Sequence, residues 1–122
     1  MKKIDNNVVK TADISIDASS FIPEVAAVRG VRIQYGKDTN GKKDDDSIEA
    51  VRYDCVNMEN LSTFTIKVEG KKPVVMQETV EDAEQPLYIA IPVSDVVIKV
   101  YDVSYGRAKV SIISPYVSLI TD

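Results

Sequence analysis

The sequence contains no histidine, no tryptophan and only one cysteine, Cys55. Histidine is the commonest general base near neutral pH and the commonest transition-metal ligand, so zinc chemistry and Ser-His or Cys-His nucleophile pairs are excluded. No glycine-rich phosphate loop and no calcium-loop spacing occurs either. Carboxylate catalysis, Mg²⁺ chemistry and a lysine nucleophile are left open, but no motif supports them. We therefore expect no enzyme, no catalytic residue, no metal site and no cofactor.

Long hydrophobic runs are also missing. A membrane span takes about twenty apolar residues, and no such run occurs. The first seven residues, MKKIDNN, lack the apolar stretch of a secretion signal. A single cysteine, which cannot form an internal disulfide, fits a reducing compartment. We therefore expect a cytoplasmic protein without membrane contact. Its 122 residues, 44% of them apolar, suffice for one core, so residues 1–122 are expected to form one domain.

The net charge of −4 argues against a generic polyanion binder, because phosphate neutralisation by Lys and Arg usually dominates such binding. This acidity is local. Residues 73–86 carry four acidic and no basic side chains, which equals the whole net charge. The rest of the chain is therefore close to neutral, and the acidic segment is suited to docking a basic protein partner.

Alternation of apolar and polar residues, which is typical of half-buried strands, dominates the chain. It predicts strands over 12–17, 28–35, 48–55, 63–69, 87–91, 96–101, 108–112 and 117–119. A further short strand is expected over 73–77, and a short acidic helix or loop over 78–85, ended by Pro86. The strand over 96–101 is apolar on both sides, which favours a central place in a sheet.

Two loops have recognisable compositions. GKDTNGKKDDDS, over 36–47, is too polar to pack and is predicted to be a long, mobile hairpin tip. Its consecutive aspartates do not converge on one point, so we expect no hard-cation site there. DVSYGR, over 102–107, is predicted to be a hairpin connection in which Gly106 takes a positive φ.

A count of five to seven full strands among these segments, with at most one short, late helix, indicates an all-β protein. A small Greek-key barrel of the OB type fits, because in that fold a three-strand meander comes first, a short helix or loop follows, and a hairpin closes the sheet. A β-sandwich built from the same strands is the alternative, since periodicity does not distinguish the two folds.

The alternation divides the residues of the first meander between two faces. One face is expected to be the core, formed by Val31, Ile33, Tyr35, Val51, Tyr53, Cys55, Phe64, Ile66 and Val68. The other carries Arg32, Arg52 and Lys67, three cations that are suited to following the phosphates of a single strand. The alternative is an ordinary solvated face on which Asp54 and Glu69 act as cross-strand partners of those cations.

Six tyrosines are present, and Tyr105 differs from Tyr35 and Tyr53, which periodicity assigns to the core. It lies in the predicted 102–107 turn, two residues before Arg107. An exposed ring beside a cation is suited to stacking on a base, with Arg107 contacting a phosphate. The alternative is that Tyr105 covers the core as a lid. Cys55 reads as a small core hydrophobe.

Two stretches carry a family resemblance: YDCVNMENLSTFTIKVEGK over 53–71, and QPLYIAIPVSDVVIKVYDVSYGRAKVSIISPYVSLI over 85–120. Over residues 50–120 the chain resembles the small single-stranded-DNA-binding proteins of filamentous phages and conjugative elements. The resemblance implies an OB-type fold, homodimers, cooperative coating of single strands, and stacking aromatic rings at Tyr53 and Tyr105. The chain departs from the family in its acidity, its extra N-terminal stretch and the aspartates within 36–47.

The sequence therefore predicts a non-catalytic protein of a phage or mobile element that binds single-stranded DNA. Its contact residues are expected to be Arg32, Arg52, Tyr53, Lys67, Tyr105 and Arg107. The alternative is a structural or protein-interaction β-domain that binds no nucleic acid.

Overall fold

The computed structural model describes residues 22–104 and 107–121, so the strand predicted over 12–17 lies outside it. Among the described residues the protein is all-β, with one short α-helix and one 3-10 turn, as predicted. The strands are β1 (Val25–Lys37), β2 (Lys43–Val56), β3 (Thr63–Glu69), β4 (Leu87–Ala90), β5 (Val97–Ser104), β6 (Arg107–Ser114) and β7 (Ser118–Leu119). The helix is α2 (Gln77–Asp82), and the 3-10 turn is η2 (Val93–Asp95).

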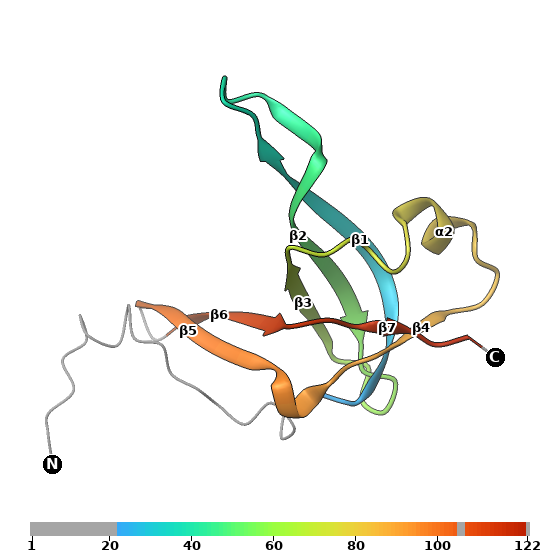
Figure 1. Cartoon of the computed structure of the whole chain (residues 1–122). Coiled ribbons are helices and arrows are strands. Elements are labelled where there is room, and N and C mark those ends of the chain that lie inside the picture. The colour runs from blue at the N-terminus through green and yellow to red at the C-terminus, as the bar shows by residue number, and fades with distance from the viewer. Residues whose placement is uncertain (1–21, 105–106, 122) are drawn as a thin grey trace, which may run out of the picture.

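All seven strands belong to one sheet with the order β5-β6-β3-β2-β1-β4-β7 (Figure 1). The antiparallel meander β1-β2-β3 comes first, α2 follows, and the β5-β6 hairpin joins β3 through a parallel pairing of β6. The meander followed by a short helix agrees with the expected order, but the β5-β6 hairpin does not close the sheet, because β4 pairs with β1 and β7 pairs with β4 at the other edge. The pairings of the described residues leave the sheet open between β5 and β7, so the closed barrel stays a prediction. A single sheet does not match the alternative of a two-sheet sandwich.

The core lies on the face of the meander that the alternation predicted. Val31, Tyr53 and Ile66 occupy paired positions on β1, β2 and β3, and each is at most 5% exposed. The row continues through Ile112 of β6 to Ile98 of β5. One continuous row of apolar side chains therefore crosses five strands, and it ties the β5-β6 hairpin to the meander.

The β1-β2 hairpin is longer than its composition predicted, and its register shifts on both sides of Tyr35. The strands reach Lys37 and resume at Lys43, so the expected loop over 36–47 shrinks to the turn at 38–42. Asp38 orders this turn, because its Oδ1 accepts hydrogen bonds from the backbone N–H groups of Asn40 and Lys42, at 2.8 and 2.9 Å. Gly41 takes a φ of +81°, which a side chain would oppose. The β1-β2 hydrogen bonds and the Asp38 cap together order this polar segment, which lacks apolar side chains to pack.

The segment after β3 is not the short strand that was predicted over 73–77. Side chains hold it instead of a ladder: the Val74 N–H donates to the Tyr53 hydroxyl at 3.0 Å, and Val75 is buried. The Val31 N–H donates to Oε1 of Gln77, the first residue of α2, at 2.7 Å. The pairing of β1 with β2 shifts between Val28 and Gly30, just before this N–H. The Gln77 side chain therefore supplies the acceptor for the Val31 N–H where the ladder is irregular.

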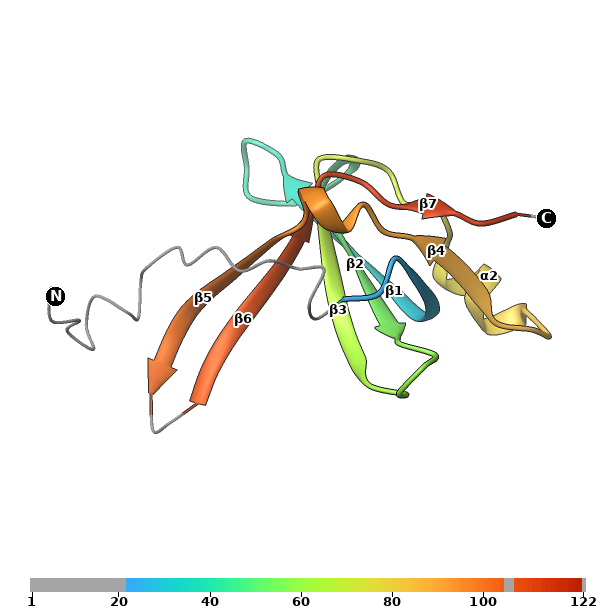
Figure 2. The same ribbon diagram turned by 90° about the horizontal axis from the view of Figure 1, so that it is seen from below.

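The prediction that the strand over 96–101 is central was wrong, because among the strands of residues 22–104 and 107–121 β5 lies at an edge of the sheet. Its core-facing residue Ile98 is 5% exposed, whereas Val97 on the opposite face is 39% exposed. Figure 2 shows the β5-β6 hairpin diverging from the meander. The second apolar face of β5 is therefore surface, not a second core. No helix among the described residues is long and apolar enough to cross a membrane.

Replacing Tyr53 by phenylalanine should lower the free energy of unfolding by about 1–3 kcal/mol, because the half-buried Val74 N–H loses its acceptor. Urea denaturation followed by circular dichroism measures this. Tyr35→Phe is the matched control, since it removes a hydroxyl from a half-buried ring of the same meander that lies outside the core cluster. Equal losses in the two variants would contradict the importance of the Tyr53 bond.

Cys55 should resist thiol reagents in the folded protein. Its side chain is fully buried, and burial, with a smaller contribution from the Asp54 charge, raises the pKa of the thiol to about 12. Because the thiolate is the reactive species, labelling near pH 8 should be slow until denaturant is added. The reaction with a chromogenic disulfide reagent measures this, and rapid labelling of the native protein would place the thiol at the surface.

Candidate functional site

The three cations predicted to share a face lie side by side. Arg32 of β1 pairs with Arg52 of β2, and Arg52 pairs with Lys67 of β3, so the three occupy one cross-strand row on the face opposite the core. We call these three residues the cation row. The placement follows from the two-residue rhythm, since each cation is the neighbour in sequence of a core residue.

Carboxylates accompany two of the three cations, as the alternative interpretation expected. Arg32 Nη2 lies 2.8 Å from Asp54 Oδ1, and Lys67 Nζ lies 3.6 Å from Glu69 Oε2. The Arg32 side chain is 60% exposed, and exposed ion pairs contribute at most about 1 kcal/mol. A phosphate that displaces or shares Asp54 at Arg32 therefore meets a small energetic obstacle, whereas the Lys67 side chain is only 27% exposed.

Among the described residues, no carboxylate contacts Arg52 directly. Its Nη1 donates to Gln34 Oε1 at 2.8 Å, and Gln34 Nε2 donates to Glu49 Oε2 at 2.6 Å. The amide thus orients the guanidinium and separates it from the acid. Arg52 keeps its charge at the centre of the cation row, where Arg32 and Lys67 flank it.

The row continues into apolar residues. Lys67 pairs with Ile113 of β6, and Ile113 pairs with Val97 of β5. Ile113 is half-buried and Val97 is exposed. Three cations followed by two aliphatic side chains therefore form one line across five strands, with charge at one end and apolar surface at the other.

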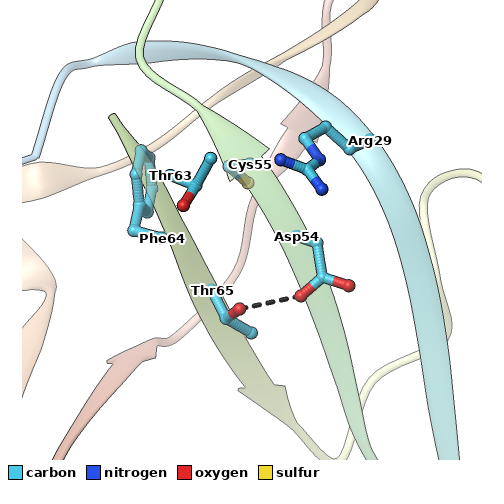
Figure 3. A pocket seen from close by; sticks show the side chains of 6 residues that line it. All are labelled: Arg29, Asp54, Cys55, Thr63, Phe64 and Thr65. Carbon is cyan, nitrogen blue, oxygen red and sulfur yellow. Dashed lines mark hydrogen bonds between the residues drawn. The ribbon is translucent and has the colours of Figure 1, made fainter. Parts of the chain in front are cut away.

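Next to the cation row lies a pocket of about 230 Å³, shown in Figure 3. Its lining residues are Arg29, Asp54, Cys55, Thr63, Phe64 and Thr65. The Thr65 hydroxyl donates to Asp54 Oδ1 at 2.7 Å, which is the dashed line of the figure. Figure 3 shows the Arg29 side chain reaching from β1 toward the Asp54 side of the pocket.

Sequence reasoning missed Arg29. It occupies the register shift between Val28 and Gly30, where the two-residue rhythm fails to assign a face. The signal that marks it is the adjacent Gly30, because a glycine inside a strand often accompanies a bulge.

The geometry beside the cation row changes the pKa of the Asp54 carboxyl. Its partial burial raises the pKa, but hydrogen bonds from Thr65 and Arg32, with the charges of Arg32 and Arg29, outweigh that effect. The pKa of Asp54 therefore lies below its usual value. The group is an anion and a hydrogen-bond acceptor at neutral pH.

Of the two aromatic residues predicted to stack on bases, Tyr53 does not join the cation row. Tyr53 is 1% exposed and points into the core, so it offers no ring face to a base. Tyr105 lies outside the described residues, and Arg107 begins β6 with a side chain that is also outside the description. Within residues 22–104 and 107–121, no three His, Cys, Asp or Glu side chains come together as a metal site.

No protein-family model matches the chain, and comparisons with curated proteins and with solved structures found no match either.

Asp54 should stabilise the fold at neutral pH and lose that effect in acid. Because its folded pKa is depressed, the unfolded chain takes up the proton first as the pH falls below about 3.9. The stabilisation is present above that pH and disappears as the pH falls through the folded pKa. Thermal unfolding of wild type and Asp54→Asn at about pH 7 and about pH 2.5 measures this. The difference in melting temperature between wild type and Asp54→Asn should be smaller at the lower pH. A difference that stays constant would contradict this role of Asp54.

Proposed function

We propose that this protein binds single-stranded nucleic acid across the cation row, as a cytoplasmic protein of a phage or mobile element. The observation that carries the proposal is the direct pairing of Arg32, Arg52 and Lys67 on the face opposite the core. Neighbouring strands lie about 4.8 Å apart, so three adjacent cations span about 10 Å. A single strand laid across the strands would meet all three with successive phosphates.

The apolar end of the line supports the same orientation of the ligand. Bases unstack in a bound single strand and need apolar surface to cover their faces. Ile113 and Val97 supply such surface directly beyond Lys67. The phosphates would lie over the cations, and a base would lie against the two aliphatic side chains.

The affinity should be modest and sensitive to salt. Three phosphate contacts predict a slope of about −2 for log K against log salt, since each contact to a single strand contributes about 0.7. The net charge of −4 opposes binding of any polyanion at long range. Fluorescence anisotropy with a labelled mixed-sequence single strand at low salt, repeated with the duplex, tests the proposal directly.

The double variant Arg52→Gln with Lys67→Gln should weaken single-strand binding and reduce the salt slope by about 1.4, because two phosphate contacts are lost. The matched control is Lys37→Gln with Lys42→Gln, which removes the same charge from the exposed end of the β1-β2 hairpin. Anisotropy titrations at several salt concentrations measure both. If both double variants weaken binding and change the salt slope equally, binding depends on the overall charge and not on the cation row. That outcome would refute the site.

A protein-interaction domain is the second candidate, and the exposed apolar residues of the β5-β6 hairpin favour it. Val97 is 39% and Val110 50% exposed, and β5 is an edge strand within the part of the chain that the structure describes. An edge strand can pair with another strand. A second copy of the chain, giving a homodimer, or another protein would cover them. Such an apolar interface should respond little to salt, whereas phosphate binding should weaken steeply.

A further inference from the structure

We infer that the pocket beside the cation row reads the base of a bound single strand through Asp54, and that it prefers cytosine to thymine. This inference rests on the proposed function, because the cation row must first hold the strand. It adds a base-reading site to a surface that otherwise contacts only phosphates and apolar base faces.

The two oxygens of Asp54 differ. Oδ1 accepts from both Arg32 Nη2 and the Thr65 hydroxyl, at 2.8 and 2.7 Å. Oδ2 accepts no hydrogen bond from any described residue. One oxygen therefore anchors the side chain, and the other is left for a ligand.

Gly30 leaves room beside the second oxygen. It pairs with Asp54 across the ladder, and a Cβ at this position would lie 3.4 Å from Oδ2 and 3.5 Å from Gln77 Oε1. Any side chain beyond that Cβ would compete with a ligand for the space around the carboxylate. A hydrogen at Gly30 leaves that space open.

An ionised carboxylate only accepts hydrogen bonds, so the group facing Oδ2 must be a donor. Cytosine carries an amino group at N4, whereas thymine carries the O4 acceptor at the same place on a ring of the same size. The two rings have the same size, so the pocket distinguishes the bases by the hydrogen-bonding group on their edge. Cytosine would donate to Asp54, and thymine would oppose one oxygen with another.

Arg29 favours a nucleotide over a simple ion as the occupant. Its exposed side chain lines the same pocket as Asp54, so an anion-binding and a donor-binding group lie together. A metal ion would find one carboxylate beside a guanidinium, which is a poor ligand set. A nucleotide carries both a phosphate for Arg29 and a base amino group for Asp54.

The test compares oligo-dC with oligo-dT of equal length by fluorescence anisotropy at low salt and slightly alkaline pH. Wild type should bind oligo-dC at least about fivefold more tightly, since one good base-edge contact discriminates by at least that factor. Asp54→Asn should remove this preference, because its amide can donate to thymine O4 while its carbonyl still accepts from Arg32 and Thr65.

Glu69→Gln is the matched control. It removes one negative charge from the same face, beside Lys67 and outside the pocket. It should tighten binding of both oligonucleotides equally and leave their ratio unchanged.

Equal affinities of wild type for the two oligonucleotides, or a dC/dT ratio that Asp54→Asn leaves intact, would overturn base reading while the proposed function stands. Binding of neither oligonucleotide would overturn both. A ratio that collapses in Asp54→Asn and persists in Glu69→Gln supports the inference.

Discussion

The register of the β1-β2-β3 ladder is the constraint on which the rest depends. It places Val31, Tyr53 and Ile66 in one buried row and their sequence neighbours Arg32, Arg52 and Lys67 in the row beside it on the opposite face. A slip of one residue would exchange the two rows and bury three charges. The cost of that exchange fixes the register, and the same constraint that builds the core builds the cation row.

Departures from the ladder create the features that regular strands do not provide. The shift between Val28 and Gly30 brings Arg29 to the pocket, and just beyond it Gln77 serves the Val31 N–H from a different part of the chain. Tyr53 similarly uses its hydroxyl to hold Val74. In each case a polar group inside or beside the core finds a partner far away in sequence, and this connects the segment before β4 to the meander.

The sequence was sufficient to predict what depends on local rhythm. The meander, its two faces, the β5-β6 hairpin and the helix near 78–85 all follow from alternation and turn residues. The edge position of β5 was not predictable, because strand order depends on pairings between distant segments. The sequence pattern also does not distinguish a buried Val97 from an exposed one. The tip over 36–47 was mistaken for a loop because its composition conceals the Asp38 cap. Arg29 escaped because a bulge breaks the rhythm that assigns faces.

The borders of the cation row have a consequence for ligand width. Asp54 lies on one side of the row, and Glu49 and Glu69 lie on the other, so acidic side chains flank the three cations on both sides. Under the proposed function, a narrow polyanion aligned with the row would contact the cations along its length. A broader one, such as a double helix, would bring its second chain of phosphates over the acids, so this arrangement would favour a single strand without contacting the features that define a duplex.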